Sequence, residues 1–283
     1  MDSNVMLHET GKRRKTCIII GRGAIAALAH LLLRHEVFRR HYQIRLCQSA
    51  GTGNFRADFA RLSPLLDDAS ILIYQPPIWA PWADDGEIYP QLMQAGSSKT
   101  LRLSVPYVVF NPLWPHHHNE AQRAAAVAAQ FDDRSLLFSY SDAHVARMVA
   151  EGATPQEIVD RYRAMDIPAT LDLTRLGDNV IAQQRPKEDE TDVKVLDFIL
   201  ETYRGERLFY CFNHVSNLLN LHIANQILKK IDLKSLSYDV LEQTCLLQPP
   251  EIPVHPSIVK YFRLEVDDAE YAISSRALPE IYL

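Results

Sequence analysis

A glycine-rich turn near the N-terminus is the first segment whose residues could bind a ligand. Gly21-Arg22-Gly23-Ala24-Ile25-Ala26 follows a short β-branched run and precedes an Ala- and Leu-rich stretch, which is the pattern G-x-G-x-x-A between a strand and a helix. Such a turn presents backbone N–H groups at a helix N-terminus, where phosphate binds favourably. The pattern leaves three interpretations open: a nicotinamide or flavin site, a site for another phosphate-bearing or acyl ligand, and a tight turn without a ligand.

The segment Cys47-Gln48-Ser49 argues against a dinucleotide site and offers a nucleophile instead. A dinucleotide-binding fold needs an acidic residue at the end of its second strand to bind the ribose hydroxyls, and none stands there. Neighbouring parallel strands open their carboxyl ends into one crevice, so this segment could lie beside the glycine turn. The Cys47 thiol or the Ser49 hydroxyl could then attack a carbonyl if a base activates it. Alternatively, Cys47 is a small buried apolar residue.

A general base is expected at Asn213-His214, which follows a predicted strand at 207–212 and precedes Ser216, a plausible helix cap. An imidazole on such a loop suits general base catalysis, although it could also face solvent in a capped turn. Asp142, in Tyr140-Ser141-Asp142-Ala143-His144, could orient a catalytic imidazole. It could instead supply the negative charge that favours a helix N-terminus.

The sequence predicts no metal centre. Three adjacent imidazoles, His116 to His118, cannot easily face one ion from a regular helix or strand, and no Cys, Asp or Glu follows at zinc-site spacing. A surface loop lining a pocket, with one imidazole on an anionic ligand, is the expected alternative. The four cysteines lie far apart without a C-x-x-C pair, which indicates reduced thiols; they are Cys17, Cys47, Cys211 and Cys245.

The bulk composition excludes some classes of partner. The 283 residues are 47% hydrophobic and 23% charged, as in ordinary globular proteins. A net charge of -5 argues against a broad basic surface for nucleic acid. No stretch approaches the ~20 apolar residues that span a bilayer, and a signal peptide pattern is missing. We therefore expect a cytoplasmic protein without a transmembrane segment.

The elements that must position these residues change character near residue 115. Before it, predicted strands alternate with helical patterns, which favours a mainly parallel sheet, Rossmann-like or SGNH-like; the strands are 16–20, 42–47, 71–74 and one within 101–110, and the helical patterns are 24–35 and 55–66. Pro106 indicates an edge or a break in the last strand. After residue 115, helices are predicted at 121–131, 141–151, 191–203 and from Ser216 to Lys230. Ser141 is expected to cap the second of these, and Thr154-Pro155-Gln156-Glu157 is expected to open a further helix.

Two further expectations complete this picture. The charge run 187–190 is predicted to be a solvated helix start or loop, and the strand at 207–212 could rejoin the sheet. The chain is thus expected to be α/β, with a disordered tail at 1–15 and one composite domain at 16–283. Its parallel half runs from about 16 to 115, and its largely helical half from about 116 to 283.

Taken in order, several segments resemble the WcbI family of capsular-polysaccharide biosynthesis proteins over roughly residues 16 to 265. No single motif carries the match; it rests on the order and spacing of the set. After the strand, glycine turn and helix, the segments are Ile73-Tyr74-Gln75, Pro106-Tyr107-Val108-Val109-Phe110 running on to Pro115, Tyr140-Ser141-Asp142, Glu151-Gly152-Ala153-Thr154-Pro155-Gln156-Glu157, Arg207-Leu208-Phe209 with Asn213-His214, and Ile252-Pro253-Val254-His255-Pro256.

The resemblance implies an α/β core with added helices, binding of CoA or acetyl-CoA, and acetyl transfer onto a capsular or other surface glycan. The family's first turn reads Gly-Asn-Cys-Gln, and its cysteine is the attractive nucleophile. Here the turn reads Gly21-Arg22-Gly23-Ala24, so glycine stands where the cysteine would be. The family's Asn-His-Pro segment becomes Asn213-His214-Val215, which keeps the histidine as a candidate base but loses the proline.

Because Gly23 cannot form an acyl-enzyme, three outcomes follow. Transfer could be direct, with His214 as base; the nucleophile could have moved to Cys47 or Ser49; or the protein could bind CoA or a glycan without catalysis. An enzyme using a nucleotide cofactor is a further alternative. The candidate catalytic residues are His214, Asp142 and Cys47, and the candidate CoA-binding residues are Gly21, Arg22, Gly23, Gln48, Gln75 and Asn213. Gly23 leaves room for phosphate near the backbone, and Arg22 adds a charged donor.

Overall fold

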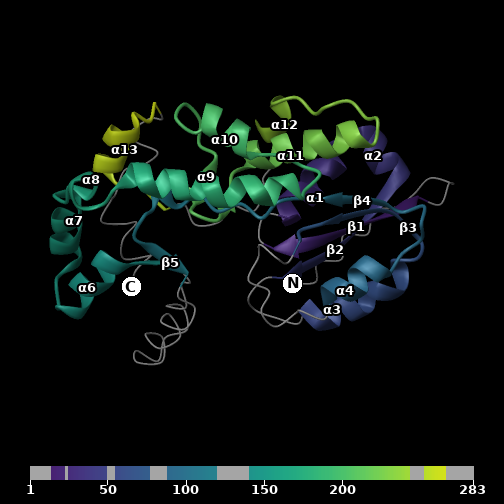
Figure 1. The fold of residues 1–283 in the computed structure, drawn as a ribbon, viewed down its shortest axis with the longest axis horizontal. Helices are drawn as coiled ribbons and strands as arrows, with labels where there is room; N and C mark the ends of the chain where they lie inside the picture. The colour runs from purple at the N-terminus through teal and green to yellow at the C-terminus, as the bar shows by residue number, and fades with distance from the viewer. Residues whose placement is uncertain are drawn as a thin grey trace.

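A four-stranded parallel sheet forms the centre of the N-terminal half (Figure 1). The computed structural model describes residues 14–22, 25–49, 55–76, 88–119, 140–242 and 252–265. The strands are β1 (Lys15–Arg22), β2 (Tyr42–Ser49), β3 (Ala69–Tyr74) and β4 (Leu101–Ser104), in the order β2-β1-β3-β4. All three pairings are parallel, which confirms the predicted mainly parallel sheet.

The two faces of the sheet are covered by different helices (Figure 1). On one face lie α1 (Ile25–Arg34) and α11 (Asn217–Lys230), which pack against each other, and on the other lie α3 (Phe55–Leu62) and α4 (Ile88–Gln94). Strand β1 is buried on both faces, and its residues 17–20 have no exposed surface. Cys17 and Ile19 belong to the large hydrophobic cluster on the α1 and α11 face, whereas Ile18 and Ile20 belong to the smaller cluster on the other. A continuous β-branched run suits such a strand.

The strand order creates a crevice between β1 and β3. The chain passes from β1 to β2 through α1 and α2 (Glu36–His41), and then crosses back over β1 to form β3 on its other side. Ligands of open α/β sheets bind at the carboxyl ends of strands where the winding reverses in this way. Gly21 at the end of β1 and Gln75 just after β3 lie at this place.

The chain leaves the sheet after β4, as the break predicted at Pro106 requires. β4 is an edge strand and ends two residues before this proline, which lacks the N–H needed to continue a ladder. At the same point the sheet is tied to the helical half, because the backbone N–H and the hydroxyl of Ser104 both donate to Asp192 Oδ2 at 2.8 Å. Further on, the N–H of Phe110 donates to the carbonyl of Phe212 at 2.6 Å.

The strand predicted at 207–212 does not return to the parallel sheet, so that expectation was wrong. β7 (Phe209–Cys211) pairs antiparallel with β8 (His214–Val215). The two strands are separated by only two residues, and such a short connection joins antiparallel strands. The resulting hairpin is a separate unit that contacts the segment following β4 through the Phe110–Phe212 hydrogen bond.

The remaining described elements are mostly helices, and those after residue 115 agree with the largely helical half that was predicted. They are η1 (Ser63–Leu65), η3 (Asn111–Leu113), β5 (His117–Asn119), β6 (Tyr140–Asp142), α6 (Ala143–Ala150), α7 (Pro155–Arg163), α8 (Ile167–Thr170), α9 (Leu173–Asp189), α10 (Leu196–Thr202), α12 (Asp239–Glu242) and α13 (Pro256–Phe262). In Figure 1, α6, α7, α8 and α13 gather at one end, and α9 runs from there toward the sheet. Among the described residues, no helix is long and apolar enough to span a membrane.

Local signals predicted some helix boundaries well and others poorly. The capping box of Thr154 and Glu157 opens α7 as expected. The cap of α6 is Asp142 rather than Ser141. The run 187–190 is the end of α9, not a solvated start, because the buried Glu188 carboxylate accepts the N–H groups of Val195 and Leu196 at the first turn of α10. The predicted helix at 121–131 and the tail at 1–13 lie outside the described residues.

Asp142 is therefore expected to stabilise the fold. Its Oδ1 caps α6 and its Oδ2 accepts the hydroxyl of Tyr162 at 2.8 Å, with no exposed surface. Asp142→Ala should lower the free energy of unfolding by about 2 kcal/mol, because a cap and a buried acceptor are both lost. Urea unfolding followed by circular dichroism measures this. Asp178→Ala, on the exposed surface of α9, is the control; equal stability of both variants would contradict the assignment.

Candidate functional site

The crevice between β1 and β3 brings Gly21 against Gln75. The N–H of Gln75 donates to the carbonyl of Ile20 at 3.1 Å, which continues the β1–β3 ladder by one residue. A Cβ atom at Gly21 would lie only 2.7 Å from Gln75 Oε1. Glycine at position 21 thus leaves space for the end of the buried Gln75 side chain, which a larger residue would have to displace.

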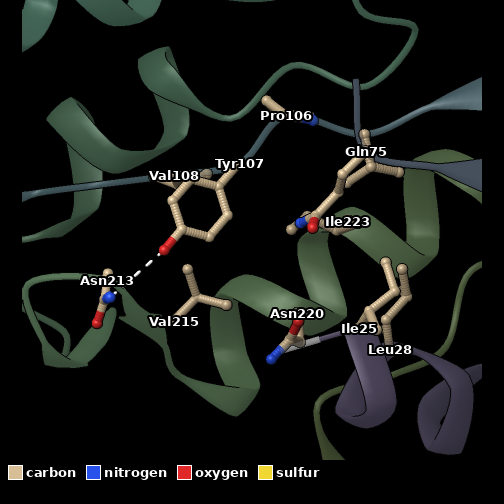
Figure 2. Close-up of a pocket in the computed structure, with 11 residues that line it drawn as sticks. Ile25, Leu28, Gln75, Pro106, Tyr107, Val108, Asn213, Val215, Asn220 and Ile223 are labelled. Atoms are coloured by element: carbon tan, nitrogen blue, oxygen red, sulfur yellow. Dashed lines mark hydrogen bonds between the residues drawn. The ribbon is translucent and has the colours of Figure 1, made fainter. Parts of the chain in front are cut away.

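A small pocket opens beside Gln75 on the α1 and α11 face (Figure 2). Its volume of about 20 Å³ is roughly the space of one water molecule. Its polar groups are three carboxamides and one phenol, those of Gln75, Asn213, Asn220 and Tyr107. Its remaining walls are mostly aliphatic, from Ile25, Leu28, Val105, Pro106, Val108, Val215 and Ile223. A few polar groups within apolar walls are typical of small-molecule sites.

The hairpin contributes a thiol, an imidazole and a carboxamide in mutual contact. Cys211 and His214 are paired across β7 and β8, and the Cys211 Sγ lies 3.0 Å from the Nδ1 of His214. Asn213 Oδ1 lies 2.9 Å from the same Nδ1 and 3.3 Å from the Sγ. Asn213 Nδ2 donates to the Tyr107 hydroxyl at 3.4 Å (Figure 2). Asn213 therefore links the thiol and the imidazole to the pocket.

A neutral His214 ring carries one proton, either on Nδ1 or on Nε2, so two tautomers are available. With the proton on Nδ1, this nitrogen donates to Asn213 Oδ1 and leaves Nε2 as the basic atom. With the proton on Nε2, Nδ1 accepts from the Cys211 thiol. With the proton on Nδ1, Asn213 fixes the position of the ring, which is the role that was expected of Asp142; with the proton on Nε2, the Cys211 thiol is the group that bonds to Nδ1.

Burial sets the charge state of this group. It lowers the pKa of His214, because the protonated imidazole is poorly solvated there. It raises the pKa of Cys211 to about 11, although hydrogen bonds with the backbone of Asn213 and His214 oppose this increase. At neutral pH the imidazole is thus neutral and the thiol protonated. A neutral imidazole is the form that accepts a proton from a nucleophile.

The structure brings some of the predicted residues together and separates others. Gln75 and Asn213 both line the pocket, and Gly21 lies against Gln75. Gly21 pairs with Gln48, and Arg22 with Ser49, so the ends of β1 and β2 are adjacent as expected. Gly23 lies outside the described residues. Cys47 is fully buried with Ile18 and Ile20 on the α3 and α4 face, whereas Cys211 belongs to the cluster on the opposite face. The structure therefore does not place Cys47 beside His214.

Asp142 also lies away from the pocket. It belongs to the end of the molecule formed by α6 and α7, far from α11 in Figure 1, and its hydrogen bonds hold α6 and Tyr162. His116 contacts the ring of His144 edge-on, with centroids 4.4 Å apart. Among the described residues, no three His, Cys, Asp or Glu side chains are grouped to hold a metal ion.

Sequence reasoning did not identify Cys211, Tyr107 or Asn220 as parts of the site. A signal existed for Cys211, because the polar Asn213 suggests a tight turn and a tight hairpin would bring Cys211 and His214 face to face. No local signal existed for Tyr107, whose contact with Asn213 joins residues 106 positions apart. Asn220 lies inside a predicted helix, where its burial depends on packing against the sheet.

Comparison with known proteins identifies a solved structure with the same fold and a family to which the sequence matches. A solved structure of WcbI, a polysaccharide biosynthesis enzyme, described as the native protein without a disulfide bond between CoA and a cysteine, superposes with a TM-score of 0.61. The match covers 80% of this chain and 71% of the other at 19% identity, so it shows a shared fold. No curated protein matches the chain. The family model for the polysaccharide biosynthesis enzyme WcbI matches residues 16–236. Because this match spans well over half of its length, the chain belongs to the WcbI family of polysaccharide biosynthesis enzymes.

Proposed function

We propose that this protein binds CoA thioesters and transfers the acyl group, acetyl in the simplest case, to a hydroxyl of a glycan during capsular or surface polysaccharide biosynthesis. The observation that carries the proposal is the neutral His214, held by Asn213 beside a pocket at the β1–β3 crevice. Membership of a polysaccharide biosynthesis family supports a sugar acceptor. The solved structure of WcbI, in its native form without a disulfide bond between CoA and a cysteine, supports CoA as the donor. We place the reaction in the cytoplasm, where CoA thioesters are formed.

The two ends of CoA require different partners. The phosphates suit the turn at Gly21, Arg22 and Gly23, since backbone N–H groups at a helix N-terminus and a guanidinium both bind anions. The pantetheine arm contains two amides, which match the carboxamides of Gln75 and Asn213 in the pocket and that of Gln48 on the neighbouring strand. Because the pocket has room for little more than one water molecule, entry of the arm must widen it.

In the proposed reaction, His214 accepts the proton of the nucleophile that attacks the thioester carbonyl. The carbon–sulfur bond to CoA then breaks, and the imidazolium returns the proton to the leaving thiolate. Asn213 holds the imidazole in position during both transfers. The acceptor hydroxyl receives the acyl group, and free CoA is the second product.

A CoA- or glycan-binding protein without catalysis is the second candidate. Glycine at position 23, where the family resemblance places a cysteine, favours it, because this turn cannot form an acyl-enzyme. The two candidates share CoA binding and differ only in turnover, so acyl transfer to sugar acceptors separates them. The third hypothesis is an enzyme with a nicotinamide cofactor, and it predicts that the protein binds NAD⁺ instead of CoA.

CoA binding is expected to stabilise the protein, since a ligand of the folded state alone raises the free energy of unfolding. Millimolar CoA should raise the melting temperature in differential scanning fluorimetry, and NAD⁺ should not. Arg22→Ala should weaken CoA binding about tenfold in calorimetry, because a charge-assisted hydrogen bond is lost. Arg45→Ala removes an exposed guanidinium from β2 and should bind as wild type. No shift with CoA would refute the proposal.

Removal of the base should abolish turnover but spare binding. His214→Ala is expected to reduce acyl transfer by at least about 100-fold, the usual contribution of a general base. The CoA dissociation constant should stay within about twofold, because the base acts mainly in the transition state. His30→Ala, an exposed imidazole on α1, should behave as wild type. Transfer retained by His214→Ala would exclude the residue from this role.

The pH dependence should report the buried imidazole. Because burial lowers the pKa of His214 below 6.5, the neutral, active form persists as the pH falls through 6.5 and is lost only at lower pH. The acidic limb of kcat/KM should therefore lie below 6.5. Asn213→Asp places a carboxylate on Nδ1, which favours the imidazolium and should move the limb upward by about one unit. A wild-type limb above 6.5, or one that Asn213→Asp leaves in place, would count against His214.

A further inference from the structure

We propose that Cys211 is the nucleophile of this transfer and carries the acyl group between CoA and the acceptor, with His214 as its base. The inference rests on the proposed acyl transfer and adds a covalent intermediate to it. The expected family nucleophile is missing from the turn at Gly23, and the thiol in the hairpin takes over its chemistry. The sequence alone pointed to Cys47 or Ser49 for this role.

The hairpin geometry is suited to proton transfer. Cys211 Sγ and His214 Nδ1 are 3.0 Å apart, within reach of a direct transfer. Backbone pairing sets this contact, because Cys211 and His214 are register partners of β7 and β8. The hairpin is anchored to two other segments by backbone hydrogen bonds from Phe110 N to Phe212 O and from Ile252 N to Tyr210 O. The bond from Ser216 N to Leu208 O closes the hairpin itself.

The other described thiols lack this arrangement. Cys17 lies in the middle of β1 with no exposed surface, and burial raises its pKa with no opposing contribution. Cys47 is buried in the cluster on the far face of the sheet from the hairpin. For Cys211, hydrogen bonds of the backbone of Asn213 and His214 oppose the effect of burial. Among the described cysteines, Cys211 is the one whose sulfur is shown in contact with an imidazole that can take its proton.

A second observation points to a ligand next to this pair. Asn220 is 2% exposed and its carboxamide lines the pocket (Figure 2). Within the described part of the chain, this carboxamide forms no hydrogen bond. The Asn220 amide atoms are not among the described fully buried polar atoms that lack a partner. They are therefore available to the pocket, where a polar group of a ligand, such as an amide or thioester carbonyl, fits them as a partner. Asn213 lines the same pocket and contacts the Cys211 Sγ at 3.3 Å.

The chemistry balances in two steps. In the first, the Cys211 thiol gives its proton to His214 Nδ1 while Sγ attacks the acyl carbonyl of acyl-CoA. The bond between that carbon and the CoA sulfur breaks, and the CoA thiolate takes the proton from His214. In the second, the acceptor hydroxyl gives its proton to His214 and its oxygen attacks the Cys211 thioester. The Cys211 sulfur leaves and takes up that proton, which restores the free enzyme.

Protonation of Cys211 at neutral pH is consistent with this order of events. With a pKa of about 11, the thiol is not a free thiolate, so it depends on His214 at the moment of attack. Such a thiol is protected from oxidation and alkylation while the site is empty. It becomes reactive only when an acyl donor lies against it.

Trapping the intermediate tests the inference on the wild-type protein. Acetyl-CoA is mixed with enzyme in the absence of acceptor, the reaction is quenched in acid, and the intact and peptide masses are measured. One acetyl group is expected on the peptide containing Cys211, with release by hydroxylamine and by sugar acceptors. Detection of this labile adduct supports the inference, whereas acetyl transfer without any adduct at Cys211 argues against it.

A second test of the inference uses variants of the protein. Cys211→Ala and Cys211→Ser should lose the adduct and at least about 100-fold of the transfer rate, while the CoA dissociation constant changes less than about twofold. Cys17→Ala removes another fully buried thiol from the same hydrophobic cluster and should retain both adduct and transfer. Wild-type rates in Cys211→Ala, with CoA still bound, would overturn the inference and leave acyl transfer standing. Failure of the wild type to bind CoA would instead overturn the proposed function.

Discussion

The path of the chain as it leaves β4 determines whether a site exists at all. Pro106 cannot continue the ladder, so the segment leaves the sheet two residues after Ser104 and passes along the hairpin, where Phe110 donates to Phe212. The Ser104–Asp192 hydrogen bonds hold the start of this segment. The indole N–H of Trp114 holds its far end by donating to Ile252 at 3.1 Å. Tyr107 lies between these attachments and meets Asn213. Without this path, the hairpin would have no defined position relative to the crevice.

Burial and chemical reactivity are coupled in this arrangement. The aliphatic walls of the pocket stabilise the fold, because apolar area is removed from water. Burial of the neighbouring hairpin likewise keeps His214 neutral and Cys211 protonated, since a low-dielectric environment disfavours both charged forms. The polar groups present are mostly carboxamides, which can donate and accept hydrogen bonds without adding charge. The site is therefore suited to an uncharged electrophile such as a thioester, and anionic groups of a donor must bind outside it.

Prediction from the sequence succeeded where the deciding interactions are local. The run 17–20, the Ala- and Leu-rich helix α1 and the Thr154–Glu157 capping box all formed as predicted. It failed where a side chain or strand had several possible partners and packing decided between them. The 187–190 run was expected in solvent, yet Glu188 is buried because its carboxylate caps α10. The strand at 207–212 was a candidate for the parallel sheet, yet it pairs with the next strand along the chain. Asp142 was a candidate partner of His214, yet it caps α6 at the other end of the molecule.

The sequence by itself therefore determined the class of fold, the family, and the glycine turn and histidine around which a site could form, because periodicity, caps and motif order are properties of short segments. Tertiary structure decided which residues share that site. Contacts such as Tyr107 with Asn213, or the position of Cys47 on the opposite face from Cys211, depend on strand order and on the direction of alternate side chains in a sheet. These are set only when segments more than a hundred residues apart pack together.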